Sequence, residues 1–262
     1  MNNVFVYCEM DGCHVADVSL ELLTKGRKLA NELGCQLEAI CAGTGLEGVE
    51  KQVLPFGVDR VHVFDAPGLF PYTSLPHTSI LVNLFKEEKP QICLMGATVI
   101  GRDLGPRCAA RLHTGLCADC THLDVDMPIY KDFLRGASTL PEAKIDGMAT
   151  AKVMGKDHDV SRDLKMTRPA FGGNLMATII CPRFRPSMAT VRPGVMKKAA
   201  YDEAKAKAVK VTKYDVKLDA ADLQTEVVEV VKAAKKLVDL IGADYIVSVG
   251  RGISKDVEGG IK

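Results

Sequence analysis

The chain has 262 residues, and its 34 lysines and arginines nearly balance 33 aspartates and glutamates, which gives a formal net charge of +1 at pH 7. This balance predicts no general affinity for nucleic acid or acidic membranes, and no apolar run reaches the roughly 20 residues that a membrane-spanning helix needs. Nine cysteines, an odd number, indicate free thiols in a reducing compartment, so we expect a cytoplasmic protein without membrane insertion.

The first half of the chain alternates short apolar runs with helical patterns, which is typical of βαβ units around a parallel sheet. We expect strands at residues 3–8, 36–42, 60–64 and 91–95, and helices at 18–33, 47–56, 79–88 and 104–112. Gly34 is expected to cap the first helix, and Pro90 follows the end of the third. The predicted fold class is therefore α/β, with a parallel-sheet, nucleotide-binding-like N-terminal domain.

One glycine motif in this half formally matches a dinucleotide-binding fingerprint. Gly43, Gly45 and Gly48 follow a predicted strand, and Asp65 lies near the end of the next one. The fingerprint belongs to the first strand of its unit, however, and Asp65 arrives early. We therefore expect a plain turn at this position.

Residues 166–194 carry a Gly-Gly turn between two apolar strands, framed by three Arg-Pro pairs. Gly172 and Gly173 permit backbone angles and close approaches that a Cβ would forbid, while Phe171 and Asn174 offer an aromatic edge and an amide. Each proline favours an extended conformation for the arginine before it, which directs a permanently charged group outward. These arginines are Arg168, Arg185 and Arg192. The segment predicts a loop that holds a planar anionic ligand.

The second half of the chain is expected to extend the sheet with strands at 148–154, 175–181, 188–191 and 209–214. Residues 197–210 have the composition of an exposed, lysine-rich connector. An amphipathic helix at 224–240 should lead into a strand at 245–249. Gly250, Arg251 and Gly252 then lie where a strand meets a helix, a place that suits a nucleotide cofactor; the alternative is a simple turn with an exposed arginine.

Four blocks of sequence in this order resemble bacterial electron transfer flavoprotein alpha subunits, including the electron-bifurcating type. They are TRPAFGGN at 167–174 with RPSMATVRPG at 185–194, GRDLGPR at 101–107, TGLCADCT at 114–121 and VGRG at 249–252. The resemblance implies that residues 1–220 form domain I, which contacts a beta subunit. Residues 221–262 would be the connecting helix and first strand of a truncated, Rossmann-like flavin-binding domain II, and we expect the natural chain to continue beyond Lys262.

The same resemblance implies two sets of cofactor contacts. Arg251, with Gly250 and Gly252, would bind the FAD of this subunit. A second set would line the outer wall of the flavin site in the beta subunit, or pack against that subunit without touching its cofactor. This set contains Gly115, Leu116, Thr121, Arg168, Phe171, Gly172, Gly173 and Asn174. No catalytic side chain is implied, because the cofactor supplies the chemistry.

The TGLCADCT block also offers four potential soft ligands for zinc, namely His113, Cys117, Cys120 and His122. In the family that the chain resembles, a threonine often replaces Cys117, and a metal site would not tolerate that exchange. We therefore prefer a helix end and a loop with incidental thiols, and we predict no metal.

The function implied by the resemblance is electron transfer. FAD would relay single electrons between a flavin in the beta subunit and a dehydrogenase of the acyl-CoA or 2-hydroxy acid type. In bifurcation, NADH would supply electron pairs, with ferredoxin or flavodoxin as second acceptor. Two alternatives stay open: a simple carrier between an acyl-CoA-type dehydrogenase and a quinone reductase, and a flavin-free nucleotide-binding scaffold subunit.

Overall fold

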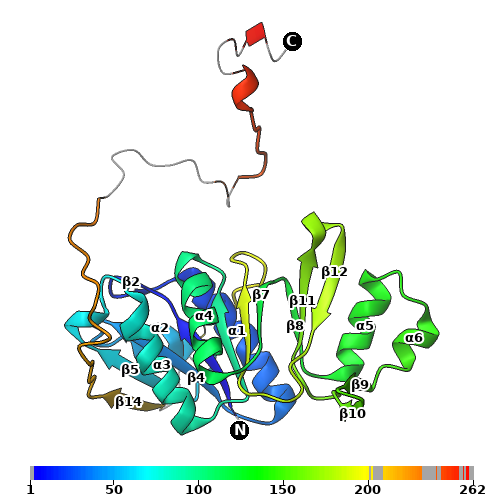
Figure 1. The fold of residues 1–262 in the computed structure, drawn as a ribbon, viewed down its shortest axis with the longest axis horizontal. Helices are drawn as coiled ribbons and strands as arrows, with labels where there is room; N and C mark the ends of the chain where they lie inside the picture. Colours follow the sequence, from blue (N-terminus) through cyan, green and yellow to red (C-terminus); the bar gives the residue numbers. More distant parts are fainter. Residues whose placement is uncertain are drawn as a thin grey trace. The chain divides into compact units, whose positions relative to one another are not determined.

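A computed structural model describes residues 3–200, 202, 209–231, 240, 243–253, 256 and 258–259 of the chain. It divides into two compact units, Met1–Val227 and Val228–Lys262. All of the sheets lie in the first unit (Figure 1). Within the described part of the chain, none of the helices has the length and apolar content that a bilayer crossing would require.

The first unit is built on a seven-stranded sheet, with strand order β14-β5-β4-β1-β6-β13-β7. Every neighbouring pair in this sheet is parallel, which confirms the α/β prediction. The strands are β1 (Val4–Cys8), β4 (Leu37–Gly43), β5 (Arg60–Asp65), β6 (Ile92–Gly96), β7 (Leu116–Cys120), β13 (Ser187–Val191) and β14 (Lys210–Tyr214). The strands expected at 3–8, 36–42, 60–64, 91–95, 188–191 and 209–214 are therefore confirmed.

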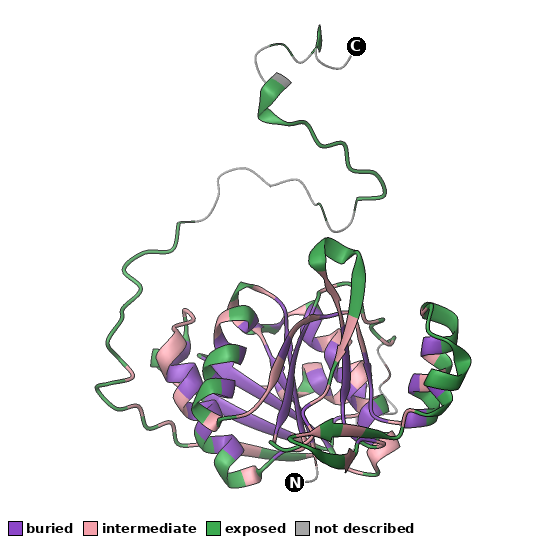
Figure 2. Cartoon of the chain, turned by 45° about the vertical axis from the view of Figure 1, so that its right-hand side comes forward, coloured by how far each residue is buried: buried purple, intermediate pink, exposed green. Residues whose placement is uncertain are grey.

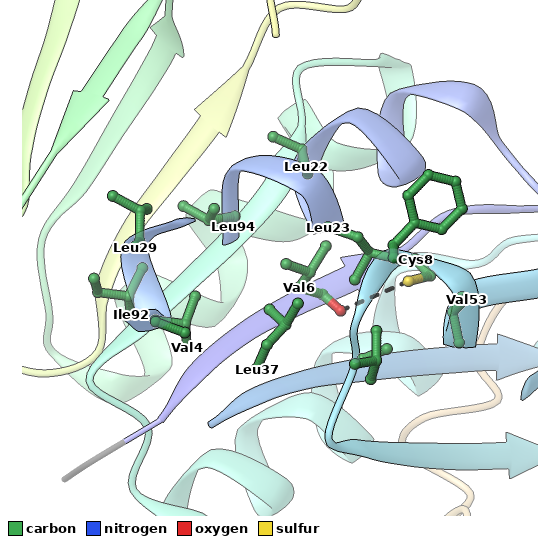
Figure 3. Close-up of a cluster of buried hydrophobic side chains, with 14 of the residues drawn as sticks. Val4, Val6, Cys8, Leu22, Leu23, Leu29, Leu37, Val53, Ile92 and Leu94 are labelled. Carbon is green, nitrogen blue, oxygen red and sulfur yellow. Dashed lines mark hydrogen bonds between the residues drawn. The ribbon is translucent and has the colours of Figure 1, made fainter. Parts of the chain in front are cut away.

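Helices cover both faces of this sheet, as the alternation of side chains along β1 shows. Val4, Val6 and Cys8 belong to one buried cluster, whereas Phe5 and Tyr7 belong to another. Side chains of α1 (Asp17–Leu33) fill the first cluster (Figure 3). Side chains of α3 (Ser74–Glu88) and α4 (Val99–Leu112) fill the second. Each large apolar side chain buried here contributes about 1.5–3 kcal/mol to folding.

The ends of these helices follow local chemistry, with some shifts from the expected bounds. Gly34 caps α1 at a φ of 69°, as predicted. The helix expected at 47–56 is shorter, because Pro55 lacks an amide hydrogen: α2 (Glu50–Val53) passes into a 3-10 turn at Leu54–Phe56. α3 and α4 begin earlier than expected. A proline in the first turn of α3 is tolerated, since the N–H that it lacks would have no helical partner.

Residues 122–180, which we call the insert, interrupt the sheet between β7 and β13. We had expected this region to extend the main sheet, and it does not. The strands expected at 148–154 and 175–181 are present at 150–153 and 175–179, but they belong to smaller, separate sheets. β8 (His122–Asp124), β11 (Lys165–Ala170) and β12 (Leu175–Ile179) form a separate antiparallel sheet. A 3-10 turn at Phe171–Gly173 connects β11 to β12. The other elements of the insert are α5 (Met127–Ala137), α6 (Glu142–Asp146), β9 (Thr150–Val153) and β10 (Lys156–Asp159). Its outer surfaces are exposed, in contrast to the buried main sheet (Figure 2).

Two short elements complete the first unit: the hairpin of β2 (Met10–Asp11) and β3 (His14–Val15), and a 3-10 turn at Pro67–Leu69. In the second unit, residues 251–253 form a 3-10 turn. The helix expected at 224–240 is wrong for residues 224–231, which are irregular, and residues 232–239 lie outside the described chain. The expected strand at 245–249 is absent, and the division at residue 220 stays a prediction.

Candidate functional site

The carboxyl ends of β1, β6 and β13 meet at one edge of the main sheet. The Thr98 hydroxyl there donates to the Glu9 carboxylate and accepts the Gly101 N–H at 3.1 Å, which caps α4. Burial is the main cause that raises the pKa of Glu9. A Cβ on Gly101 would lie 1.8 Å from the Gly96 carbonyl oxygen, so this turn requires glycine.

Asp119 lies between two guanidinium groups at the same edge. Its Oδ1 is 2.9 Å from Nη2 of Arg102, and its Oδ2 is 3.7 Å from Nη2 of Arg192. Arg102 also donates its Nε–H to the Ala97 carbonyl at 2.9 Å. The two arginine side chains are 55% and 47% exposed, and the carboxylates of Asp119 and Glu9 at this edge balance their two charges.

The hairpin of β11 and β12 confirms the predicted Gly-Gly turn between two strands. Phe171, Gly172 and Gly173 have φ angles of 49°, 68° and 90°. A Cβ on either glycine would meet no atom within 4 Å, so these glycines are needed for backbone angle and not for space. Asn174 donates its side-chain N–H to the Phe171 carbonyl at 3.0 Å. Phe171 is 80% exposed and is available for contact at the tip.

The three arginines that precede prolines do not converge on this hairpin. Arg192 faces Asp119, and Arg168 donates its Nε–H to the Pro169 carbonyl at 3.3 Å. Arg185 instead donates to Asp163 at 2.5 Å, in a pair that is 14% and 9% exposed. The expectation that Arg185 is directed toward a ligand is therefore wrong, because a buried carboxylate holds it inside the fold.

The predicted loop at 115–121 is a strand, β7, and its two ends lie far apart. A Cβ on Gly115 would lie 2.9 Å from the Cys181 sulfur, and Leu116 packs against the buried cluster beneath α4. At the other end, Thr121 donates its N–H to the Thr167 carbonyl at 2.9 Å. Five residues of strand span about 13 Å. The structure thus joins Thr121 to β11, whereas Gly115 lies against Cys181, just beyond the end of β12 and away from the hairpin tip.

A groove with a cavity volume of about 930 Å³ lies inside the insert, between the β11–β12 hairpin and α5. Two of the predicted residues, Thr121 and Asn174, line it. Apolar side chains make up most of the remaining wall, among them Met127, Phe133 and Met176. The volume falls in the range of small-molecule sites, which are largely apolar with a few polar groups.

Apart from Thr121, the hydroxyl groups of this groove were not identified as site residues from the sequence. Tyr130 donates its hydroxyl hydrogen to Thr178 at 2.9 Å, and the Thr178 and Thr167 hydroxyls lie 2.9 Å apart. Burial is the main cause that raises the pKa of Tyr130. The His122 ring stacks on Phe133 with centroids 3.6 Å apart. These side chains come from four elements, α5, β8, β11 and β12, so no single motif marks them.

Lys165 also lines the groove and is buried at 1% exposure. Its Nζ donates to the carbonyls of Val125 at 2.9 Å and Ser161 at 2.7 Å. Burial lowers its pKa to about 8, although nearby aspartates act in the opposite direction. The amine is therefore held by main-chain oxygens, with a charge that burial disfavours.

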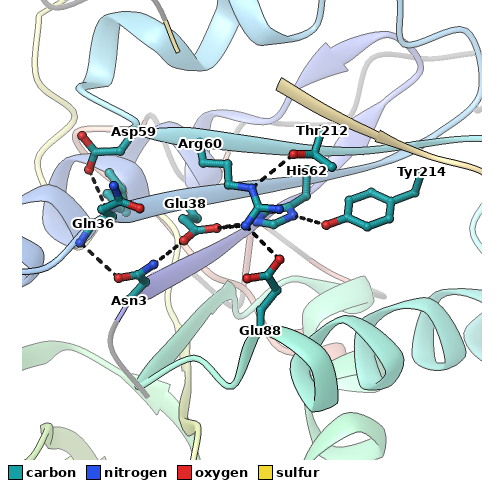
Figure 4. Close-up of polar contacts among 10 residues, drawn as sticks. Asn3, Gln36, Glu38, Asp59, Arg60, His62, Glu88, Thr212 and Tyr214 are labelled. Carbon is teal, nitrogen blue, oxygen red and sulfur yellow. Dashed lines mark hydrogen bonds and ion pairs between the residues drawn. The ribbon is translucent and has the colours of Figure 1, made fainter. Parts of the chain in front are cut away.

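A second polar cluster lies on β4, β5 and β14, at the end of the main sheet away from β7 (Figure 4). His62 and Glu38 are fully buried, and Nε2 of His62 lies 2.5 Å from Oε2 of Glu38. Nδ1 of His62 lies 2.8 Å from the Tyr214 hydroxyl, and burial raises the pKa of Tyr214 to about 12. Arg60 reaches Glu88 at 2.8 Å. These contacts tie the last strand, β14, to β4 and β5.

The Gly43–Gly48 motif is occupied by its own chain. The Asp65 carboxylate accepts the N–H groups of Gly45 and Leu46, both at 2.8 Å. Those two amides are therefore not available to a phosphate. The arrangement agrees with the plain turn that we expected.

The four residues weighed as zinc ligands have other roles. His113 forms the left-handed cap of α4 at a φ of 52°, and His122 lies 2.5 Å from the Asp124 carboxylate. Cys117 and Cys120 are buried. Among the described residues, no group of three or more metal-binding side chains comes together.

Residues 250–252, the predicted contacts for FAD, belong to the second unit. Arg251 and Gly252 are exposed, and a Cβ on Gly250 or Gly252 would meet no atom within 4 Å. One guanidinium and two glycines suit the phosphates of a dinucleotide. The described residues of this unit enclose no cavity for an isoalloxazine ring, however, so they fit FAD only in part.

Comparison with known sequences extends these observations. Residues 4–139 and 143–217 match the model of the electron transfer flavoprotein domain. The chain is 53% identical over 259 residues to the acryloyl-CoA reductase electron transfer subunit beta of Anaerotignum propionicum, covering 99% of this chain and 68% of that protein. It is 44% identical to protein FixB of Clostridium saccharobutylicum, covering 95% and 64%. It is 41% identical to the electron transfer flavoprotein subunit alpha of Clostridium acetobutylicum, covering 95% and 65%. The chain thus spans about two thirds of these relatives.

One expectation is overturned by these relatives. The chain was identified as an alpha subunit, but the relative at 53% identity is named subunit beta, whereas one at 41% is named subunit alpha. Relatives with different subunit names match nearly all of this chain. These matches therefore do not assign the subunit.

Proposed function

Because the chain belongs to the electron transfer flavoprotein family, we propose that it is one subunit of a heterodimer that relays single electrons through FAD. The observation that carries this proposal is the family match, which runs over residues 4–139 and 143–217. A redox carrier needs no catalytic side chain of its own, because its cofactor supplies the chemistry.

The insert supports a specific place for the partner subunit. The exposed Phe171 at the hairpin tip, with Gly172, Gly173, Asn174 and Thr121, forms a surface beside the groove. We assign these residues and Arg168 to the wall that faces the flavin of the partner subunit. Gly115 and Leu116 are assigned a supporting role, because they pack at the far end of β7.

The remaining predicted residues are assigned to this chain's own FAD, which exchanges electrons singly when it is bound. Arg251 would place a fixed positive charge beside the cofactor and favour its negatively charged, reduced forms. Gly250 and Gly252 would allow the backbone to approach its phosphates. These roles are positional, and the described residues around them do not complete a ring pocket.

We further propose that the electron partner is a dehydrogenase of the acyl-CoA or 2-hydroxy acid type. The name of the relative at 53% identity, an acryloyl-CoA reductase subunit, favours the acyl-CoA type. NADH would be the donor in a bifurcating complex, with ferredoxin or flavodoxin as second acceptor. Simple transfer from an acyl-CoA-type dehydrogenase to a quinone reductase is the alternative outcome of the experiment below.

The flavin proposal is tested by purifying the full-length chain with its partner subunit and denaturing the complex. A yellow complex that releases FAD supports the proposal. A colourless heterodimer that still binds adenine nucleotides would replace it with the flavin-free scaffold.

The donor and acceptors are tested with the same complex and its dehydrogenase. Bifurcation requires that NADH reduces ferredoxin or flavodoxin only while an enoyl-CoA, such as acryloyl-CoA, is present as the second electron acceptor. Reduction of the complex by an acyl-CoA dehydrogenase, with no response to NADH, would instead identify a simple carrier.

A further inference from the structure

Two cysteines of β7 lie together although their spacing should separate them. Side chains three residues apart in a regular strand point to opposite faces. Asp119, between Cys117 and Cys120, has a φ of 60°, and the register with β13 shifts between Ala189 and Val191. The Cys120 sulfur is consequently 3.5 Å from the Cys117 carbonyl oxygen.

The two thiols are chemically unequal. The neighbouring Cys120 thiol lowers the pKa of Cys117, and the neighbouring Cys117 thiol raises the pKa of Cys120. The guanidinium of Arg168 also favours the thiolate form at both positions. One sulfur is thus the better nucleophile, and its neighbour holds a proton beside it. This is the arrangement of an attacking thiol and a resolving thiol.

We propose that Cys117 and Cys120 form a reversible disulfide when the protein meets hydrogen peroxide. The Cys117 thiolate attacks one peroxide oxygen, and hydroxide leaves with the electron pair of the O–O bond. The Cys120 sulfur then attacks the Cys117 sulfenic acid, and the Cys120 proton leaves with the hydroxyl as water. In total, two thiols and one peroxide give one disulfide and two waters, and a dithiol reductant reverses the change. The proposal does not depend on the proposed function.

A second thiol pair in the same sheet shows why position matters. Cys8 and Cys41 face each other in register on β1 and β4, and they also share a hydrogen bond. Both are fully buried, and β1 has a strand on each side. Cys117 and Cys120 are nearly as buried, at 3% and 0%, but β7 has a sheet partner on one side only. On its other side it meets β11 through the Thr121–Thr167 hydrogen bond and the Cys117 thiol, which donates to the Met166 carbonyl at 4.0 Å. A strand with a hydrogen-bonded ladder on one side opens more easily than a central one, which admits a small oxidant.

Oxidation of Cys117 and Cys120 to a disulfide would affect the candidate site through the residues next to them in sequence. Asp119, which contacts Arg102 and Arg192, lies between the two cysteines in sequence. Thr121, the next residue, holds the hairpin through the Thr167 carbonyl. A bond between the two sulfurs would constrain both contacts.

Trypsin separates the two pairs in purified full-length protein that carries Cys13→Ser and Cys35→Ser, which makes the proposal testable. Peptide 112–131 contains Cys117 and Cys120 and no other cysteine, and in this background only a Cys8–Cys41 disulfide can link peptides 1–25 and 29–51. After brief peroxide treatment and alkylation, peptide 112–131 should lose two hydrogens. It should do so at least about tenfold faster than the linked pair appears, because edge strands open more often. Dithiothreitol should restore both thiols.

Variants separate this reaction from general oxidation. Cys120→Ser should abolish the disulfide and let Cys117 proceed to sulfinic acid, whereas Cys181→Ser should leave the disulfide unchanged. The proposal is overturned if peptide 112–131 of the protein with both Cys117 and Cys120 keeps two alkylated thiols. It is also overturned if that peptide gains oxygen without forming a disulfide, or if the linked 1–25 and 29–51 peptides form equally fast.

Discussion

The main sheet and the insert treat their polar side chains in opposite ways. In the sheet, Glu38 and His62 are fully buried, and His62 joins the Glu38 carboxylate to the half-buried Tyr214 hydroxyl (Figure 4). In the insert, hydroxyls such as Thr178 line an open groove of about 930 Å³. Polar groups that are satisfied inside the chain hold strands together, whereas polar groups at an open cavity are positioned for a ligand. The difference separates the part that specifies the fold from the part that offers a site.

The largest expected effect comes from breaking the enclosed cluster. Glu38→Ala leaves the His62 ring and the Arg60 guanidinium without their buried carboxylate. Removal of one partner from such a pair costs about 3–5 kcal/mol of unfolding free energy. Urea denaturation measures it, and Glu38→Gln should lose less because it keeps the side-chain shape. A loss below about 1 kcal/mol, the value of an exposed ion pair, would show that the cluster does not stabilise the packing of these strands.

A matched pair of glycine substitutions tests close packing in the sheet against open space in the insert. Gly101→Ala places a Cβ 1.8 Å from a backbone oxygen, whereas Gly136→Ala in α5 meets no atom within 4 Å. The first should destabilise by about 1–3 kcal/mol through overpacking. The second should stabilise by about 0.5–1 kcal/mol, because alanine favours the helix. Thermal unfolding midpoints that move in the same direction would contradict the comparison.

Lys165 should make stability depend on pH in the direction opposite to that of a surface lysine paired with a carboxylate. Its pKa in the folded protein is lowered to about 8, below the ordinary value of 10.5, so the unfolded chain binds the proton more tightly. Stability should therefore rise between about pH 8 and 10.5, by an amount of order 1–2 kcal/mol, and lose this gain as pH falls. Lys165→Met should remove that slope. An unchanged slope in the variant would assign it to other groups.

The smallest expected effect concerns the groove itself. Thr178→Val removes the hydroxyl that accepts from Tyr130 and contacts Thr167. The loss should be about 1 kcal/mol, the net value of a typical hydrogen bond. Tyr130→Phe, which removes one of the two contacts, should cost less. Equilibrium unfolding measures both losses. A larger loss for the phenylalanine variant would show that the hydroxyls of Tyr130, Thr178 and Thr167 do not act as one hydrogen-bonded chain.

Local patterns in the sequence were sufficient for six of the seven strands of the main sheet. The apolar run of β1 and the amphipathic pattern of α1 with its Gly34 cap depend on neighbours within a few turns of chain. The Gly-Gly turn was also foreseen, because positive φ angles favour glycine wherever they occur. Strands at 148–154 and 175–181 of the insert were expected as well, but their place in separate sheets was not foreseen. β7 was taken for a loop because its glycine and cysteines obscured the strand.

The sequence by itself determined the α/β class, the positions of six strands of the main sheet, and the family. Only the tertiary structure placed Asp119 between Arg102 and Arg192, turned Arg185 inward to Asp163, and brought Thr121 to the hairpin. The physical reason is distance along the chain. Secondary structure follows from interactions between near neighbours, whereas these contacts join residues tens of positions apart, and packing of the whole sheet decides which of them meet.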